Sequence, residues 1–378
     1  MKLNHILIIL GLLITQTTKA QLSESATISI ITCGPGSEFY TTFGHSAIRI
    51  CDTAQSYDAV YNYGTFDFNT PNFYWKFAQG KLDYCLSKTH YTNFLASYIY
   101  EGRYVIEQYL NLTEAEKNRI YTALEYNYKP ENRHYLYDFF IDNCATRVRD
   151  IVNNNIIDRE LFVTYTPENA KSYRELLYDC TEERLLWWRL GIDLLLGARC
   201  DKKCNNIEQM FSPIEMKNQF DTTQLSDGSG TLVTKQIDTL YETRTLPRKS
   251  VSPTLVFWVM CISVITLTIT SWKKNWSLKW LDRLLFGTVG AISIVLLFMW
   301  FGTDHFCTKN NWNLLWSSPL FIYLAFTTHK SNRWIILIQT IMILIVLAGQ
   351  WIIPQQFNSA ITPISVALTI RLIDNLRK

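Results

Sequence analysis

The last third of the chain carries a series of apolar runs, and this feature limits the possible fold more than any other. Residues 21–250 are polar and rich in Tyr and Asn, whereas residues 251–378 are dominated by apolar stretches. A helix that crosses a hydrocarbon core about 30 Å thick needs roughly 17–25 apolar residues. Five segments meet this requirement, at about 252–271, 284–302, 312–328, 334–353 and 357–373. The sequence therefore predicts an α-helical five-span membrane domain behind a polar outer domain.

The charged residues between these segments predict the orientation of the membrane domain. With residues 21–250 on the outer side, the cytoplasmic loops hold three basic clusters: Lys273, Lys274, Lys279 and Arg283, then His329, Lys330 and Arg333, and finally Arg371, Arg377 and Lys378. The outer loops hold Asp304, His305 and Lys309, and then the uncharged Pro354-Gln355-Gln356. Every basic cluster falls on one side, as the positive-inside rule requires.

The N-terminus has the pattern of a secretory signal. Lys2 and His5 precede an apolar run at residues 6–14, and Thr18 and Ala20 supply small residues where a signal peptidase cleaves. The mature chain is then expected to begin at Gln21. No cysteine follows the cleavage site, so a lipid anchor is not expected. An uncleaved span is the alternative, although the apolar run is short for a bilayer.

The composition argues against several classes of site and partner. A formal net charge of +3, without a run of Lys or Arg, does not favour a nucleic-acid partner. Seven of the nine cysteines lie in the outer domain, where disulfides can form, and an odd number leaves at least one thiol free. Cys200 and Cys204 do not have the CxxC spacing, and no histidine cluster accompanies them. We expect no metal site and no cofactor.

Alternating apolar and polar stretches, interrupted by helix signals, predict an α+β outer domain. Strands are expected at residues 26–34, 47–50, 59–64 and within 84–110, including 103–110. A capping box of Thr113 and Glu116 opens a helix that ends near Tyr128, and Asp142 or Asn143 caps a second helix at about 144–155. Further along, the sequence predicts helix at 170–196, a hairpin at 227–230 and a linker at 244–249.

Two short segments about a hundred residues apart carry the candidate chemistry. Cys144 stands at the start of a predicted helix, where the helix dipole favours thiolate over thiol, and Arg147 and Arg149 add positive charge nearby. His45 opens a predicted strand and can take and return a proton. A third polar group should hold the imidazole, and Asn62 on the next strand is our candidate. Ser46, Asp67 and Tyr137 remain open as alternatives for this third position.

Each of these residues also has a purely structural interpretation. A lone Cys on a helix is most often a small buried apolar side chain, and in an exported domain it is often half of a disulfide. The Gly44-His45-Ser46 segment equally fits a hydrogen-bonded strand end. The order of the two segments favours chemistry, because an Asn-Cys helix start and a Gly-His strand suit each other's roles.

The order of a histidine strand, a polar strand and then an Asn-Cys helix resembles circularly permuted papain-like (NlpC-type) enzymes, including lecithin–retinol acyltransferase and its relatives. More closely, the segments at 43–49, 61–68 and 137–147 together resemble the periplasmic domain of the Lnb-type lipoprotein N-acyltransferases, a family long catalogued as a domain of unknown function. The resemblance covers most of residues 26–250, and the multispan region fits the family's architecture. It is specific only when the three segments are taken together.

This resemblance implies a division of the chain and an activity. It implies a signal peptide at 1–20, a periplasmic catalytic domain at 21–165, a helical and hairpin extension with linker at 166–250, and the membrane domain at 251–378. It also implies a bacterial inner-membrane acyltransferase, with Cys144 as nucleophile and His45 as base. A phospholipid would donate an acyl chain through a Cys144 thioester, and the N-terminal amine of a diacylglyceryl-cysteine lipoprotein would accept it. The oligomeric state stays open.

Several other residues are candidates for substrate binding. Asn143, Tyr137 and Arg147 lie next to Cys144 in the sequence. Asp304 and His305 follow the second span in an outer loop, where they suit either a phospholipid headgroup or a contact with the outer domain; an ordinary interfacial loop is slightly favoured. Trp187 and Trp188 either dip toward lipid or, as we favour, pack against the papain-like unit.

Two other functions compete with acyl transfer. The same fold supports a membrane-anchored cysteine peptidase or amidase that acts on the cell wall. A soluble hydrolase needs one anchor at most, however, so five spans favour a lipid substrate. The third possibility is a non-enzymatic membrane scaffold, which predicts that Cys144 is disulfide-bonded or that His45 lies far from it.

Overall fold

The outer domain is built on one antiparallel sheet. The computed structural model describes residues 21–156, 161–162, 164–181, 185–225, 229–242, 250–327 and 332–377, and within these ranges the sheet has seven strands in the order β6-β4-β3-β2-β1-β5-β7. The strands are β1 (Thr27–Cys33), β2 (His45–Asp52), β3 (Tyr57–Thr65), β4 (Asp83–His90), β5 (Val105–Leu110), β6 (His134–Leu136) and β7 (Thr234–Tyr241). Sequence neighbours β1, β2, β3 and β4 pair in turn, as consecutive strands usually do, and the connection from β3 to β4 contains a helix, α2 (Phe73–Gln79).

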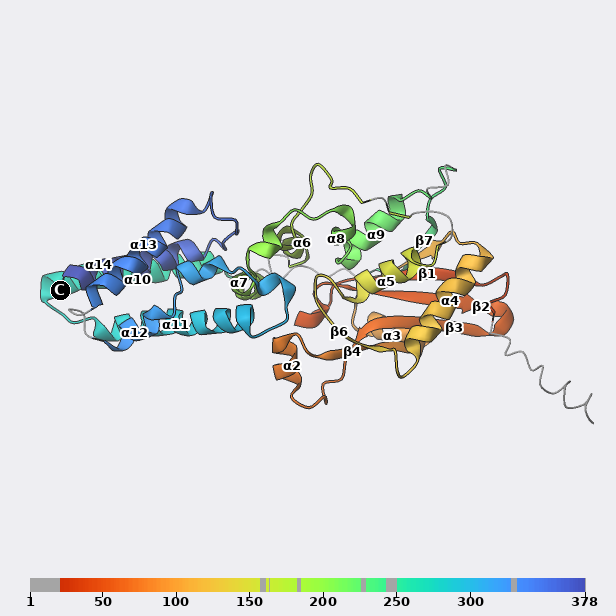
Figure 1. Ribbon diagram of the computed structural model, residues 1–378, viewed down its shortest axis with the longest axis horizontal. Helices are drawn as coiled ribbons and strands as arrows, with labels where there is room; N and C mark the ends of the chain where they lie inside the picture. Colours follow the sequence, from red (N-terminus) through yellow and green to blue (C-terminus); the bar gives the residue numbers. More distant parts are fainter. Residues whose placement is uncertain are drawn as a thin grey trace, which may run out of the picture.

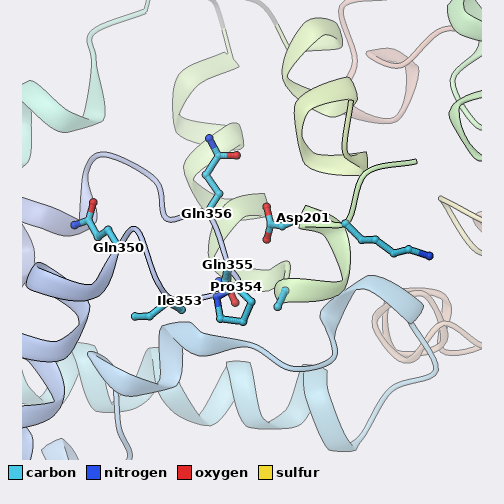
Figure 2. Close-up of a pocket in the computed structure, with 8 residues that line it drawn as sticks. Asp201, Gln350, Ile353, Pro354, Gln355 and Gln356 are labelled. Atoms are coloured by element: carbon cyan, nitrogen blue, oxygen red, sulfur yellow. The ribbon is translucent and has the colours of Figure 1, made fainter. Parts of the chain in front are cut away.

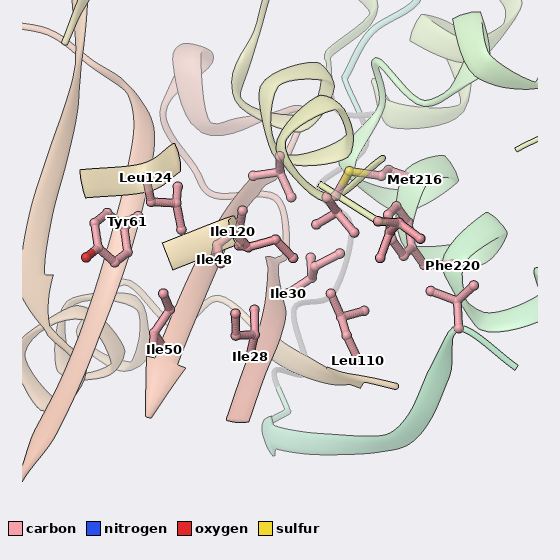
Figure 3. Packing of buried hydrophobic residues seen from close by; sticks show 14 of the residues in the cluster. Ile28, Ile30, Ile48, Ile50, Tyr61, Leu110, Ile120, Leu124, Met216 and Phe220 are labelled. Atoms are coloured by element: carbon pink, nitrogen blue, oxygen red, sulfur yellow. The ribbon is translucent and has the colours of Figure 1, made fainter. Parts of the chain in front are cut away.

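Both faces of the central strands of this sheet are buried, and the alternation along these strands assigns each residue to one face. On one side, Ile28, Ile30 and Ile48 pack against α4 (Glu114–Tyr128), α5 (Cys144–Asn153) and α9 (Pro213–Thr222), as Figure 3 shows. On the other side, Ile31 and Val60 pack against α3 (Tyr91–Tyr100). This two-sided core holds the strands that carry the candidate site.

The helix that carries Cys144 starts where the sequence predicts. Asn143 is its cap, and α5 buries Ala145, Val148 and Val152 against the sheet. The Thr113–Glu116 capping box of α4 is also present, with both of its hydrogen bonds.

Two predictions for the outer domain are wrong in part. Residues 91–100, inside the predicted strand region, form α3, because Phe94 and Tyr98 gain more from packing on the sheet than from extended pairing. The segment at 170–196 contains two helices, α6 (Tyr173–Cys180) and α7 (Leu186–Leu195). The predicted signal peptide at 1–20, residues 227 and 228 of the predicted hairpin turn, and the whole predicted linker at 244–249 lie outside the described residues.

The C-terminal part of the chain is a bundle of apolar helices that extends away from the sheet domain (Figure 1). Its helices are α10 (Pro253–Lys274), α11 (Lys279–Phe301), α12 (Leu320–Phe326), α13 (Arg333–Gly349) and α14 (Ile361–Arg377). By length and composition α10 and α11 can cross a membrane, whereas α13 is apolar but shorter. The chain ends at the tip of the bundle farthest from the sheet domain.

The segment predicted as the third span, 312–328, is not one continuous helix. It is divided into the 3₁₀ helix η6 (Trp312–Leu315) and the seven-residue α12. Between them lie Ser317, whose hydroxyl donates to the Asn313 carbonyl at 2.8 Å, and Pro319, which has no N–H to continue a helix. The sequence predicts the apolar character of this segment but not its break.

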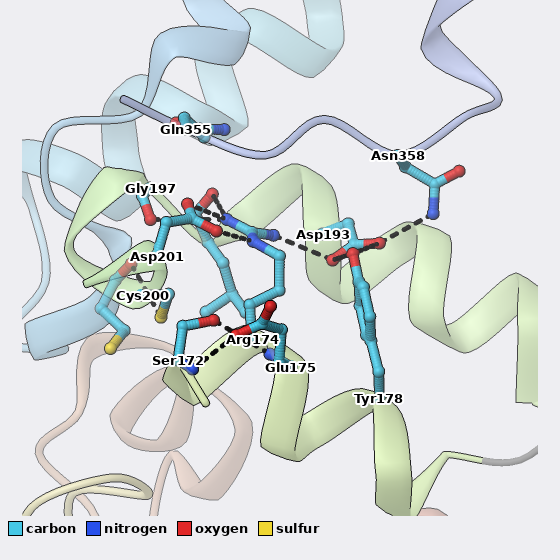
Figure 4. A network of polar contacts seen from close by, with 12 residues as sticks. Ser172, Arg174, Glu175, Tyr178, Asp193, Gly197, Cys200, Asp201, Gln355 and Asn358 are labelled. Carbon is cyan, nitrogen blue, oxygen red and sulfur yellow. Dashed lines mark hydrogen bonds and ion pairs between the residues drawn. The ribbon is translucent and has the colours of Figure 1, made fainter. Parts of the chain in front are cut away.

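A buried polar network joins the outer extension to the membrane helices (Figure 4). Arg174 on α6 is fully buried and forms ion pairs with Asp193 at 2.9 Å and with Asp201 at 2.7 Å. Asp193 on α7 also accepts hydrogen bonds from Tyr178 at 2.9 Å and from Asn358, just before α14, at 2.7 Å. Because a buried charge is costly unless it is paired, this network fixes how the two parts meet.

The helix α7 belongs with the membrane bundle. Leu190 lies in the same buried cluster as Phe286 and Val289 of α11, and the ring of Trp187 lies 6.1 Å from that of Phe257 on α10. The expectation that Trp187 packs against the papain-like unit is therefore wrong, because the apolar face of α7 turns toward the spans.

Candidate active site

Cys144 is the first residue of α5, and the local sequence fixes it there. The Asn143 side-chain oxygen accepts a hydrogen bond from the Thr146 N–H at 2.9 Å, and the Thr146 hydroxyl accepts one from the Asn143 N–H at 2.8 Å. A cap of this kind contributes about 1 kcal/mol to helix stability. The Cys144 side chain, only 7% exposed, is therefore held in the first helical turn, where negative charge is stabilised.

His45 and Asn62 bring an imidazole and an amide to this helix end from neighbouring strands. His45 is the first residue of β2, and Asn62 lies on β3, which pairs antiparallel with β2. Nε2 of His45 is hydrogen-bonded to Oδ1 of Asn62, and the His45 ring also hydrogen-bonds the Cys144 side chain. Because α5 packs against both strands, the sulfur, the imidazole and the amide form one row.

The Asn62 contact determines which nitrogen of His45 faces the sulfur. An amide oxygen only accepts hydrogen bonds, so Nε2 of a neutral His45 must carry the proton that it donates to Asn62. Nδ1 is then the nitrogen left to receive the proton of the Cys144 thiol. A fixed tautomer of this kind is what a general base next to a nucleophile requires.

The electrostatic surroundings stabilise the charged forms of both Cys144 and His45. Burial raises the pKa of the Cys144 thiol, but the positive charge and hydrogen bond of His45, together with the backbone N–H groups of Ser46 and Ala145, outweigh it, so that the pKa is lowered from 9.0. Burial lowers the pKa of His45, yet the charge and hydrogen bond of Cys144 and the bond to Asn62 raise it above 6.5 overall. The pair therefore favours thiolate and imidazolium.

Gly64 borders three side chains of the site. It lies at a bulge between β3 and β4 and has φ +85°, a conformation that favours glycine. A Cβ at this position would lie 3.5 Å from Cys144, 3.7 Å from Tyr137 and 4.0 Å from His45. Gly64 thus leaves the space beside the sulfur open.

A second layer of side chains supports His45 from the α3 side. The ring of Tyr98 stacks on the imidazole with 6.3 Å between centroids and 13° between planes, and Arg103 lies 4.6 Å from the Tyr98 centroid. Arg103 is held by a 2.7 Å hydrogen bond to the Gly34 carbonyl. Sequence reasoning missed Gly64, Tyr98 and Arg103. Gly64 lies in the segment 61–68 that carries the resemblance and Arg103 opens the predicted strand 103–110, but neither has a predicted role in the site, and the helix carrying Tyr98 lies in a region predicted to be strand.

The alternatives to Asn62 occupy other positions. Within the described part of the chain the buried Ser46 hydroxyl has no hydrogen-bond partner, and it is the backbone N–H of Ser46 that contacts the sulfur. Asp67 is exposed in a turn, where it accepts from the Asn69 N–H at 2.8 Å. Tyr137 stacks on Tyr84 with 4.3 Å between centroids, beside the open space at Gly64.

Two of the residues expected to bind substrate are already engaged within the protein. The Asn143 amide donates to the Phe139 and Phe211 carbonyls at 2.7 and 2.9 Å, in addition to its capping bonds. The Arg147 guanidinium binds Asp142 through two bonds of 2.6 and 2.7 Å and lies 3.5 Å from the centroid of Tyr135. Both therefore stabilise the turn before Cys144, whereas Tyr137 is among the residues nearest to the space at Gly64.

Asp304 and His305 contact the outer domain through α2 (Phe73–Gln79). The Asp304 N–H donates to the Gln79 carbonyl at 2.9 Å, and Nε2 of His305 lies 3.2 Å from the Phe77 carbonyl oxygen. The next residue, Phe306, donates its N–H to the Asp138 carboxylate at 3.2 Å, close to the turn that leads into α5. Of the three interpretations of this loop, the slightly favoured one is an ordinary interfacial loop, whereas the structure shows a contact with the outer domain.

A pocket of about 510 Å³ lies elsewhere, at the junction of the outer extension and the membrane bundle (Figure 2). It is lined by Asp201 and by the loop that contains Ile353, Pro354, Gln355 and Gln356. None of the row Cys144, His45 and Asn62 lines it, so its size does not make it the candidate active site. Among the described residues, no group of three or more His, Cys, Asp or Glu is placed to hold a metal ion.

The fold and the site define a membrane protein whose outer α+β domain presents a Cys–His pair next to a bundle of apolar helices. Residues 15–178 match the family model of the Lnb N-terminal periplasmic domain, and residues 245–378 match that of the Lnb transmembrane domain. The chain belongs to the Lnb family, and the resemblance predicted from three short segments is confirmed. Its sheet domain is the periplasmic part and its helical bundle the membrane part. Neither curated proteins nor solved structures give a match.

Proposed function

We propose that this protein transfers an acyl chain from a membrane phospholipid to the N-terminal amine of diacylglyceryl-cysteine lipoproteins, through a thioester on Cys144. The observation that carries the proposal is the hydrogen-bonded row of Cys144, His45 and Asn62 in a domain attached to membrane helices. Membership of the Lnb family, which suggests a membrane-associated protein of lipoprotein processing, supports it.

The first half-reaction uses the proton that Cys144 and His45 share. Nδ1 of His45 takes the thiol proton, and the thiolate attacks the carbonyl carbon of a phospholipid ester. When the tetrahedral intermediate breaks down, the C–O bond to glycerol is cleaved and the imidazolium returns its proton to the leaving alkoxide. The products are a Cys144 thioester and a lysophospholipid.

The second half-reaction restores the free thiol. The α-amine of the lipoprotein attacks the thioester carbonyl, His45 accepts a proton from the attacking nitrogen, and the C–S bond is cleaved with protonation of the sulfur. An amide and free Cys144 result. Two half-reactions through one covalent intermediate predict ping-pong kinetics. A site tethered to the membrane that holds both substrates also raises their effective concentration.

Two features distinguish this proposal from its rivals. A non-enzymatic scaffold would predict a Cys144 that is disulfide-bonded or remote from His45, whereas the thiol is free and hydrogen-bonded to the imidazole. A cell-wall peptidase or amidase shares the Cys–His chemistry but gains nothing from a membrane domain that contacts the turn before Cys144. We therefore place the lipid substrate first and retain hydrolysis of cell-wall peptides as the second candidate.

The proposal is tested in bacterial cells that lack any other lipoprotein N-acylation activity. Cells that express the wild-type chain, Cys144→Ala or the matched Cys51→Ala control are compared by mass spectrometry of their lipoprotein N-termini. Triacylated termini are expected with wild type and Cys51→Ala and should be lost with Cys144→Ala. Triacylation that persists with Cys144→Ala at equal protein levels would rule out the thioester route.

A further inference from the structure

The segment around α2 exposes a group of large aromatic side chains that the proposed chemistry does not use. This aromatic patch consists of Tyr40, Phe68, Tyr74, Trp75 and Phe77. Tyr74 is 80% exposed and Phe68 is 57% exposed, although both lie in ring contact with Phe73. Contiguous apolar surface of this kind is unfavourable in water and marks a site of interaction.

The membrane domain determines what the aromatic patch faces. Trp75 stacks on Phe298, near the outer end of α11, with 5.2 Å between centroids. The loop that follows α11 is bonded to the C-terminal end of α2 through Asp304 and His305. Figure 1 shows α2 below the end of α11 that faces the sheet domain. The patch therefore lies at the depth where a membrane helix leaves the bilayer, which is where aromatic side chains anchor to lipid.

A continuous row of rings leads from this patch to the candidate nucleophile. Phe68 and Phe66 each contact Phe73, at 5.0 and 5.7 Å between centroids, and Phe66 lies 5.2 Å from Tyr84. Tyr84 stacks on Tyr137 at 4.3 Å. Tyr137 in turn borders the space at Gly64, which Cys144 and His45 also border. The only polar groups on the rings of this aromatic track are the hydroxyls of Tyr84 and Tyr137, so the track suits a hydrocarbon chain better than a peptide.

We propose that the aromatic patch and the aromatic track bind the acyl chains of an outer-leaflet phospholipid and guide the donor ester from the bilayer to Cys144. The inference rests on the proposed function, because it supplies that reaction with its donor. Lys76, in the last turn of α2, places positive charge beside the patch, where the phosphate of such a lipid would lie. Lys81, just after α2, is exposed and lies 3.9 Å from the Asp304 carboxylate, an exposed pair that a phosphate can replace.

Photo-crosslinking tests the contact without requiring catalysis. The full chain with Cys144→Ala carries a benzoylphenylalanine at Tyr74 or Phe68, in vesicles of phosphatidylethanolamine and phosphatidylglycerol that contain a phospholipid with an alkyne-tagged acyl chain. The matched control is Tyr126, which is 58% exposed and belongs to α4, a helix that Figure 1 shows on the sheet domain away from the membrane helices. We expect at least about tenfold more lipid crosslinking at positions 74 and 68 than at 126. Equal labelling at all three positions would overturn the inference, as would labelling by a tagged diacylglyceryl peptide but not by phospholipid.

A second, kinetic experiment distinguishes failure of this inference from failure of the proposed function. Tyr74→Ser in the active chain should raise the KM for phospholipid about tenfold, because an aromatic contact with the acyl chain is lost. Tyr126→Ser should leave it unchanged. If wild type forms the Cys144 thioester and Tyr74→Ser has an unaltered KM, the lipid path is wrong and the reaction stands. If positions 74 and 68 crosslink but wild type forms no thioester, the lipid contact stands and the reaction is wrong.

Discussion

The side-chain oxygen of Asn62 on β3 is hydrogen-bonded to Nε2 of His45 on β2, on the side of the imidazole away from Cys144. Two adjacent strands thus hold the ring in the tautomer that a proton acceptor for the thiol needs. Asn62 acts through His45, so it is a positioning residue in the proposed reaction.

Loss of the Asn62 amide should slow acyl-enzyme formation. Asn62→Ala frees the His45 ring and should lower the rate about 10- to 100-fold, whereas Asn62→Asp keeps an acceptor and should retain more activity. The carboxylate should also raise the pKa of His45 further and move the alkaline limb of the pH profile upward. Rates of thioester formation with labelled phospholipid measure both effects. The matched control is Ser46→Ala, which removes a hydroxyl without a partner among the described residues; a larger loss with Ser46→Ala than with Asn62→Ala would contradict this assignment.

Alkylation of Cys144 should have an unusual pH dependence. Because the pKa of Cys144 is lowered from 9.0, reaction with iodoacetamide should extend to lower pH than for an ordinary thiol and fall off only as the pH drops through the lowered pKa. His45→Ala removes the charge and the hydrogen bond but leaves burial, which raises the pKa, so the onset should move upward. Peptide mass spectrometry after brief labelling resolves each cysteine.

The other cysteines provide an internal comparison. Burial raises the pKa of Cys51 and Cys85, and it raises the pKa of Cys180 to about 11 and that of Cys204 to about 12. At neutral pH, Cys144 should therefore be labelled ahead of them. Uniform labelling of all these thiols would argue against an activated Cys144.

The acyl transfer rate should also fall on the alkaline side, as the pH rises through the raised pKa of His45 and the leaving alkoxide loses its proton donor.

Asn143 should prove to be a structural residue and not a substrate ligand. Asn143→Ala removes the cap of α5 and two bonds to buried carbonyls, and we expect a loss of about 2 kcal/mol or more in stability. Thermal unfolding in detergent measures this loss. Asn143→Asp, which can still cap but cannot donate, should lie between. If Asn143→Ala has an unchanged unfolding midpoint and a raised KM, Asn143 binds substrate instead.

The Arg174 network should control how firmly the outer extension is attached to the membrane bundle. Arg174→Ala leaves the buried Asp193 without its ion-pair partner, and such a change costs about 3–5 kcal/mol. The exposed Lys171–Asp179 pair at 2.6 Å offers a control, since Lys171→Ala should cost less than about 1 kcal/mol. Unfolding midpoints and limited proteolysis between residues 181 and 205 report the difference. Equal effects of the two substitutions would show that the network does not fix this junction.

Local signals explain the parts of the site that the sequence predicted. The Asn143–Cys144 helix start and the Gly44–His45 strand are each encoded within a few residues, so their secondary structure could be assigned. Asn62 is predicted as the partner of His45 because consecutive strands tend to pair, which places the two residues side by side. The family resemblance then tied these segments together.

The remaining features depend on tertiary contacts that no local pattern encodes. Tyr91–Tyr100 has the aromatic content of a strand, and it becomes a helix because Phe94 and Tyr98 bury against the sheet. The role of Gly64 depends on a bulge in its pairing with β4, and the contact of His305 with α2 joins positions 228 residues apart. The break at Ser317–Pro319 is not predicted, because the residues around it form one apolar run.

The central claim is a covalent acyl intermediate on Cys144, and peptide mass spectrometry tests it most directly. The purified full chain is incubated with a phospholipid that carries an isotope-labelled acyl chain and is digested at acidic pH, where a thioester survives. We predict a Cys144 peptide heavier by one labelled acyl group, which disappears when a diacylglyceryl-cysteine peptide is added and whose label then appears as an amide on that peptide. Labelled amide product without an acylated Cys144 peptide, under conditions in which a thioester standard is recovered, would contradict the account.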